Sequence, residues 1–122
     1  MTHTLLFLPD VEEDAIGGYA WYEAKSPGLG EEFLRVFYAC ASEINRNPLL
    51  YPKVYGEFRR RLFRRFPYAI YFTIKENRIV VIGLFHCARD PRTVGRKLKD
   101  REKLERPNSI NLTRNKLSGL FG

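Results

Sequence analysis

Segment 79–85, with the sequence Ile-Val-Val-Ile-Gly-Leu-Phe, is apolar along its whole length. A short continuous apolar segment rich in β-branched residues indicates a strand that is covered on both faces. The preceding segment 68–75 alternates instead, so that one face of it is apolar, and the turn 76–78 joins the two. We therefore expect the segments 68–75 and 79–85 to form a hairpin whose second strand is central in a small sheet. The segment before residue 68 is expected to add a further strand and so to form an antiparallel meander.

The first half of the chain shows helical spacing. Residues 2–8 are rich in β-branched and apolar side chains and predict a short strand that Pro9 ends. Asp10 is the expected N-cap of a helix that continues to Lys25, and a second amphipathic helix is predicted over residues 31–47. The short turn between them implies an antiparallel helical hairpin.

These elements predict an α+β fold, in which the N-terminal strand and the two-helix hairpin pack on a small antiparallel or mixed β-sheet. The adjacent Gly17 and Gly18 weaken the first helix by about 1 kcal/mol each relative to alanine, so we expect another element to pack closely there. A chain of 122 residues is enough for one compact domain, expected over residues 1–92 and followed by a surface helix and mobile tail over residues 93–122. The predicted core residues are Phe33, Phe37, Ile44, Tyr68, Ile70, Phe72, Ile74, Val81 and Ile82.

Charge is distributed unevenly along the chain. The whole sequence has 21 Lys and Arg against 14 Asp and Glu, a net charge of +7. Residues 1–50 contain three basic and eight acidic side chains, a net charge of −5, which leaves +12 for residues 51–122. A basic half in so small a domain attracts anionic partners, either phosphate backbones or acidic protein surfaces.

The densest basic feature is segment 59–66. Five of its eight residues are arginines: Arg59, Arg60, Arg61, Arg64 and Arg65. On a strand they place guanidinium groups on both faces, which suits the recognition of phosphate or carboxylate groups. Phe63 and Phe66 add a stacking surface for single-stranded RNA, and a carboxylate-rich protein segment is the other expected partner. The alternative interpretation is an edge strand that its charge protects from aggregation.

His86 ends the apolar strand, where it could serve as a general acid or base. A lone histidine is more often a hydrogen-bonded structural residue, and Asp90 before Pro91 stands at a good turn or cap position. His3 and His86 are the only histidines, and neither has a second ligand at metal spacing. There is no phosphate-binding glycine loop either, so neither a metal nor a cofactor is predicted.

Cys40 and Cys87 are the only cysteines, and both are predicted to be small core residues. Two thiols form no disulfide framework, which favours a reducing cytoplasm. The apolar segment 5–8 is too short for a signal peptide or a membrane span, so no membrane partner is expected.

Three strings carry a family resemblance: Arg59-Arg60-Arg61-Leu62, Phe66-Pro67-Tyr68-Ala69-Ile70-Tyr71 and His86-Cys87-Ala88-Arg89-Asp90-Pro91. With the strand and the helical hairpin before them, they resemble the RelE/ParE toxin superfamily of type II toxin-antitoxin modules over about residues 2–92. The resemblance implies a bacterial cytoplasmic toxin that a cognate antitoxin holds inactive. A heterotetramer with that antitoxin is one assembly that it allows.

The superfamily contains two functional classes. RelE-like members cleave mRNA on the ribosome and typically carry an arginine directly after the tyrosine that aligns with Tyr68, where this chain has Ala69. No tyrosine follows Tyr71, so a late catalytic tyrosine is missing as well. The remaining strings are similar to ParE-like members, which are non-enzymatic and inhibit DNA gyrase.

The sequence therefore predicts a ParE-like toxin without catalytic residues. The residues expected to bind the target or the antitoxin are Arg59, Arg60, Arg61, Arg64, Arg65, Tyr71, His86 and Arg89. One alternative is a ribosome-dependent endoribonuclease acting on mRNA, which would use His86 with Arg64, Arg65 or Arg89 as compensating groups. Another alternative is an inactive member that only binds the antitoxin.

Overall fold

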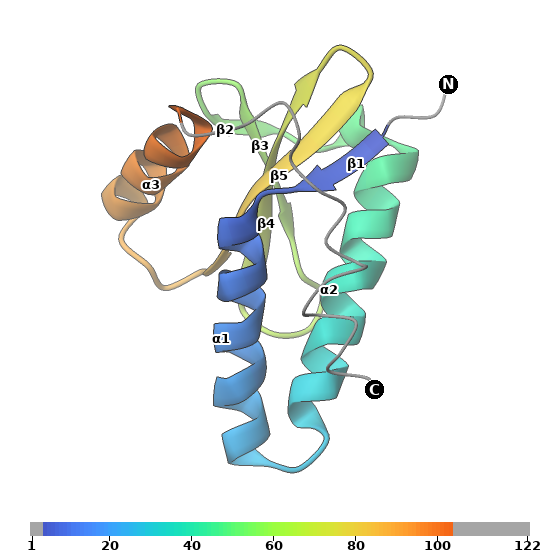
Figure 1. Cartoon of the computed structure of the whole chain (residues 1–122), viewed down its shortest axis with the longest axis vertical. Coiled ribbons are helices and arrows are strands. Elements are labelled where there is room, and N and C mark those ends of the chain that lie inside the picture. The colour runs from blue at the N-terminus through green and yellow to red at the C-terminus, as the bar shows by residue number, and fades with distance from the viewer. Residues whose placement is uncertain (1–3, 104–122) are drawn as a thin grey trace.

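A computed structural model describes residues 4–103 of the chain (Figure 1). Its elements, in chain order, are β1 (Thr4–Phe7), α1 (Pro9–Lys25), α2 (Leu29–Arg46), the 3-10 turn η1 (Pro48–Leu50), β2 (Lys53–Tyr55), β3 (Phe58–Leu62), β4 (Tyr68–Lys75), β5 (Arg78–His86) and α3 (Pro91–Lys103). The strands form one five-stranded sheet in the order β1-β5-β4-β3-β2. The predicted α+β fold is confirmed.

The sheet is mixed, because β1 runs parallel to β5 while the other neighbours are antiparallel. β5 lies between β1 and β4 and is buried from Ile79 to Phe85, as its unbroken apolar sequence predicted. A bulge interrupts its ladder: Tyr71 pairs with Gly83 and Phe72 with Val81, which leaves Ile82 as an extra residue on β5.

The interpretation of segment 59–66 as an edge strand is wrong. The edge is β2, a three-residue strand that pairs with β3, so β3 has a neighbour on both sides. β3 also ends at Leu62, earlier than the predicted strand. The segment after it turns to enter β4, and Phe66 adopts the left-handed backbone conformation in this turn, with φ of 73°.

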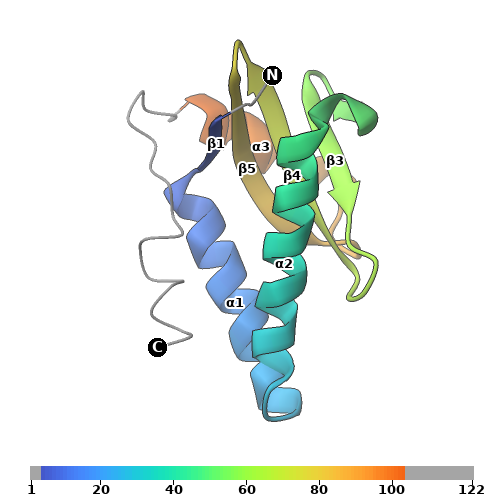
Figure 2. The ribbon, with the colours of Figure 1, turned by 90° about the vertical axis from the view of Figure 1, so that its right-hand side faces the viewer.

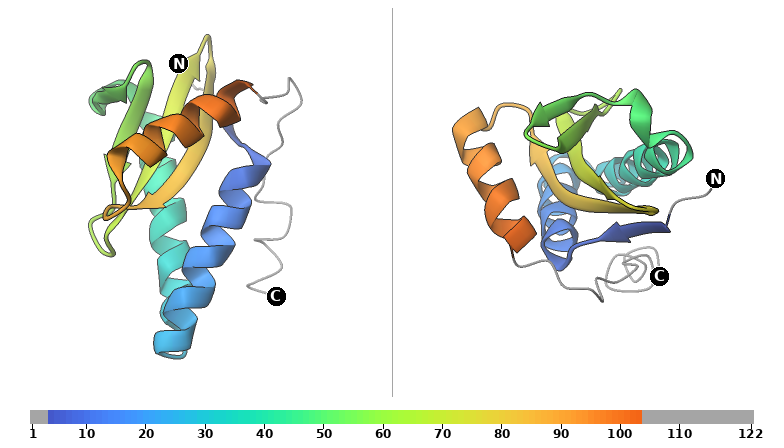
Figure 3. Two further views of the ribbon diagram at one scale, coloured as in Figure 1. Left: turned by 90° about the vertical axis from the view of Figure 1, so that its left-hand side faces the viewer. Right: turned by 90° about the horizontal axis from the view of Figure 1, so that it is seen from above.

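The helices lie on the two sides of the sheet (Figures 1, 2 and 3). α1 and α2 form the predicted hairpin, and α3 crosses the face opposite to α2 (Figures 2 and 3). Gly18 permits the hairpin to close, because a Cβ there would lie 2.5 Å from the Phe33 ring. On the other face, α3 buries Val94 and Leu98, and a Cβ on Gly83 would lie 3.1 Å from the Leu98 side chain.

Seven of the nine predicted core residues are buried, while Tyr68 and Ile74 are half-buried and pack against that core. Cys40 is buried, but the interpretation of Cys87 as a core residue is wrong, because it lies exposed in the turn after β5. The expected N-cap at Asp10 is also wrong. α1 already starts at Pro9, whose missing N–H costs nothing in the first helical turn, and its N-cap is Leu8.

α3 begins at Pro91, and Asp90 caps it as predicted, with Oδ1 accepting a 2.9 Å hydrogen bond from the Arg92 N–H. The expected mobile tail beyond α3 lies outside the described residues. Within residues 4–103, no helix is both long enough and apolar enough to cross a membrane.

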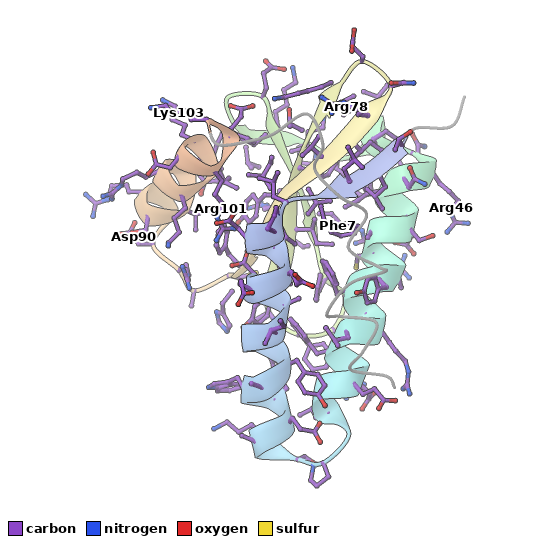
Figure 4. The ribbon with its side chains drawn as sticks, viewed as in Figure 1. Phe7, Arg46, Arg78, Asp90, Arg101 and Lys103 are labelled. Carbon is purple, nitrogen blue, oxygen red and sulfur yellow. The ribbon has the colours of Figure 1, made fainter. Side chains whose placement is uncertain are left out.

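The free edge of β5 is closed by an ion pair between two helices. β1 ends at Phe7, opposite Val81, so the backbone of β5 beyond Val81 has no strand on that side. There Asp14 of α1 accepts a hydrogen bond from the Leu84 N–H at 3.1 Å, and Arg101 of α3 donates one to the Ile82 carbonyl at 3.0 Å. Arg101 lies between α3 and α1 (Figure 4). The two side chains thus take the place of a longer β1.

Candidate functional site

The three arginines of β3 alternate between the two faces of the sheet, as predicted. Arg59 donates a 2.6 Å hydrogen bond to the Tyr51 carbonyl, and Arg61 is hydrogen-bonded to Glu43 of α2. Arg60 is paired in register with Tyr71, on the opposite face. Burial raises the pKa of the Tyr71 hydroxyl, and the neighbouring Arg60 guanidinium opposes this effect.

Arg64 and Arg65 lie beyond the end of β3, so the prediction that one strand carries all five arginines is wrong. Arg65 forms an ion pair with Glu32 of α2, and Arg64 Nη2 lies 3.8 Å from a Glu43 carboxylate oxygen. With Arg61 they line a small cleft of about 160 Å³ against α2, which we call the arginine cleft.

The acidic half of the sequence neutralises part of the basic half in the arginine cleft. The hydrogen bond from Arg61 holds the pKa of the Glu43 carboxyl below its ordinary value, and the positive charges of Arg61 and Arg64 act in the same direction. Cys40 also lines this cleft, where burial raises the pKa of its thiol. A raised pKa keeps the thiol protonated near neutral pH, so the cleft presents an ion-pair network and no activated nucleophile.

His86 and Arg89 lie in a second, larger cleft, which has a volume of about 470 Å³. We call it the Trp21 cleft. α1 forms one wall of it, and the end of β5 with the following turn forms the other. Its lining residues are Glu13, Asp14, Gly17, Gly18, Trp21, Tyr68, Leu84, Phe85, His86 and Arg89.

The His86 imidazole is held in place by two contacts. Its Nδ1 accepts a 2.9 Å hydrogen bond from the Ala88 N–H, and its ring meets Tyr68 edge-on at 5.2 Å between centroids. In the neutral ring the proton is therefore on Nε2. Arg89 is exposed and lies over the Phe85 ring, 5.3 Å from its centroid. These contacts order the turn that follows β5.

Of the three arginines that the ribonuclease alternative could use, the structure brings only Arg89 into the cleft of His86. His86 and Arg89 line the Trp21 cleft, whereas Arg64 and Arg65 line the arginine cleft, and the two clefts share no lining residue. Among the described residues, no cluster of three or more His, Cys, Asp or Glu side chains could hold a metal ion.

Sequence reasoning missed the wall that α1 contributes to the Trp21 cleft. Trp21 is the only tryptophan of the chain and 55% of it is exposed, which is unusual for so large an apolar side chain. Asp14, Gly18 and Trp21 follow one another at helical spacing, but nothing local shows that this stripe faces the end of β5, about 65 residues later.

No protein-family model matches this chain, and no curated protein matches it in sequence. Among solved structures it is similar to a chain from the chromosomal ParDE toxin-antitoxin (TA) system of P. aeruginosa. The match has 13% sequence identity, covers 70% of this chain and 96% of the other, and has a TM-score of 0.64. At this identity the likeness concerns the fold alone: the chain shares the fold of a chain from a ParDE system, which agrees with the fold that the family resemblance in the sequence predicted.

Proposed function

We propose that this protein is the toxin of a type II toxin-antitoxin module, and that it acts by binding a protein target, DNA gyrase, without cleaving RNA. A cognate antitoxin neutralises it. The fold likeness to a chain of a ParDE system supports the toxin assignment. The observation that supports the binding mechanism is that Arg64 and Arg65 line a different cleft from His86, which leaves Arg89 as the one candidate arginine beside it.

Cleavage of RNA requires a base, an acid and positive charge around one phosphate. The carboxylate of Glu13 lines the same cleft as His86, and its negative charge disfavours a phosphate there, while the second carboxylate, Asp14, is already paired with Arg101. The position after Tyr68 is Ala69, which is fully buried between Leu62 of β3 and Phe85 of β5. Neither feature supports charge stabilisation at a phosphate.

A binding function needs only a complementary surface, and the Trp21 cleft offers one. Trp and Arg are the residues that most often dominate the energy of protein interfaces, and here Trp21 and Arg89 stand exposed at one concave site. We assign target or antitoxin contacts to this cleft and to the arginines of segment 59–65. Tyr71 is only 5% exposed, so it supports Arg60, its neighbour across the strands, and makes no contact of its own.

The experiment is expression of the chain in a bacterial host, with and without the product of the neighbouring gene. We expect growth to stop without that product, and purified protein to inhibit the supercoiling of plasmid DNA by gyrase. The 5′ ends of cellular mRNA should show no new codon-positioned cuts. Uninhibited gyrase together with His86-dependent cuts would establish the ribonuclease instead. Absence of both effects would leave a protein that only binds the antitoxin.

A Trp21→Ala variant tests whether the Trp21 cleft is the surface that contacts gyrase or the antitoxin. Because Trp21 is exposed, its removal should weaken gyrase inhibition or antitoxin binding by about tenfold or more while the protein remains folded. Leu50→Ala is the control, since Leu50 is also a large exposed apolar residue and lies outside the Trp21 cleft and the arginine cleft. Equal activity of the two variants would place the contact elsewhere.

A further inference from the structure

A third cleft lies between α3 and the β2–β3 hairpin, and none of the residues that the sequence predicted to bind a partner lines it. Its volume is about 430 Å³. We call it the α3 groove. Tyr55 and Phe58 contribute aromatic surface to it, and Arg92, Arg96 and Lys99 contribute positive charge.

The apolar part of the α3 groove is built into the fold. Phe58 is buried and Tyr55 is half-buried, with its ring 6.1 Å from that of Tyr71 in the sheet. Gly95 lets α3 approach this surface, because a Cβ on Gly95 would already lie 3.2 Å from the Tyr55 ring. Two packed rings and a glycine thus form a concave aromatic surface that is present before any partner binds.

The charged part of the groove is a single stripe of α3. Arg92, Arg96 and Lys99 are four and three residues apart, so they share one side of the helix, while Val94 and Leu98 face the core. All three cations are exposed. Arg92 lies 3.4 Å from Asp90, but no acidic side chain lines the groove itself. This differs from the arginine cleft, where Glu32 and Glu43 of α2 already pair with the arginines.

Charge complementarity and the aromatic surface together define the occupant. A row of cations beside an apolar concave surface fits an acidic segment that carries a large apolar side chain. A phosphate backbone would use the cations but leave the aromatic surface unfilled. Residues 104–122 of this chain do not have the acidic character expected of a segment that binds the groove, because they contain one acidic side chain against three basic ones.

We propose that the α3 groove binds an acidic protein segment, which lays a large apolar side chain on the surface formed by Gly95 and Tyr55 and pairs its carboxylates with Arg92, Arg96 and Lys99. This surface is additional to the Trp21 cleft, and it does not depend on toxin activity.

The test uses the full-length protein and three fluorescein-labelled probes of equal charge. The first is a 12-residue peptide in which glutamates alternate with leucines, the second has alanine in place of each leucine, and the third is a single-stranded oligothymidylate. Fluorescence anisotropy should show the first peptide binding about tenfold more tightly than the second. Equal affinities of the two peptides, tighter binding of the oligothymidylate, or no binding of either peptide would overturn the proposal.

Two charge reversals on α3 locate the binding. Arg96→Glu should lower the affinity for the leucine-containing peptide about tenfold. Lys97→Glu should change this affinity little, because Lys97 is exposed but does not line the groove. Far-ultraviolet circular dichroism checks that both variants are folded. Equal losses in the two variants would mean unspecific attraction and would contradict the proposal. Sedimentation should show a monomer at the concentrations used, since a dimer that only Arg96→Glu abolishes would make a second copy of the chain the occupant.

Discussion

The guanidinium of Arg101 on α3 donates two hydrogen bonds to the carboxylate of Asp14 on α1. Nη1 lies 2.7 Å from Oδ2, and Nη2 lies 3.0 Å from Oδ1. Both side chains are only 13% exposed, and each also bonds to the backbone of β5, at Ile82 and at Leu84. One ion pair thus joins elements 87 residues apart in the sequence and satisfies backbone groups that β1 does not reach.

Removal of one member of this pair leaves the other charge buried. Arg101→Ala and Asp14→Asn should each lower the free energy of unfolding by about 3 kcal/mol, as expected for a broken buried ion pair. Urea unfolding measures the loss. Lys97→Ala, an exposed change on the same helix, should stay within about 0.5 kcal/mol of the wild type. Losses below about 1 kcal/mol in both variants of the pair would show that it contributes little.

The two adjacent glycines of α1 should respond to alanine in opposite directions. A Cβ on Gly17 meets nothing within 4 Å, so Gly17→Ala should stabilise the helix by up to about 1 kcal/mol. A Cβ on Gly18 would clash with Phe33, whose ring is enclosed by those of Tyr22 and Tyr68, so Gly18→Ala should cost about 1–3 kcal/mol. Thermal unfolding of the two variants makes the comparison, and a change of the same sign in both would refute the packing argument.

Phe37 supports the contact between the hairpin and the sheet. It is fully buried, and its ring centroid lies 5.6 Å from that of Phe7 in β1. Phe37→Ala should therefore cost about 3–5 kcal/mol through lost burial and a residual cavity. Chemical denaturation measures this, with the exposed Leu50→Ala as the control. A loss comparable to that of the control would mean that the hairpin does not depend on this residue.

The Glu43 carboxylate should make stability depend on pH in the acidic range. The hydrogen bond from Arg61 lowers its folded-state pKa from the ordinary value of 4.5. A lowered pKa stabilises the folded protein fully above the unfolded-state pKa, and this stabilisation is lost as the pH falls through the folded-state pKa.

Glu43→Gln should therefore lower the urea midpoint of unfolding at neutral pH. The difference in midpoint between this variant and the wild type should shrink when the pH falls well below the ordinary pKa of a glutamate carboxyl. Glu31→Gln is the control, because Glu31 forms only an exposed ion pair with Arg35 and should change the midpoint little at any pH. A Glu43→Gln difference that stays constant with pH would disprove the linkage.

The sequence spacing of the candidate site residues did not predict that Arg64 and Arg65 would line a different cleft from His86. Arg64 and Arg65 follow the β3 arginines after only two residues in the sequence, yet beyond the end of β3 they pair with Glu43 and Glu32 of α2. Arg61 reaches the same Glu43 from 18 residues away. Ion pairs between distant elements depend on how those elements are oriented relative to one another, and this orientation cannot be predicted from the local sequence.

The sequence by itself determined most of the elements, the α+β class and most of the core, because periods of two and about 3.6 residues follow from backbone geometry and the burial of apolar side chains. It did not determine the short edge strand β2. It also determined the central place of β5, since only a doubly covered strand is apolar throughout. The tertiary structure alone decided the parallel pairing of β1, the docking of α3 through Val94 and Leu98, and the three clefts. These depend on which residues meet across long stretches of chain, and that is settled only when all the elements pack together.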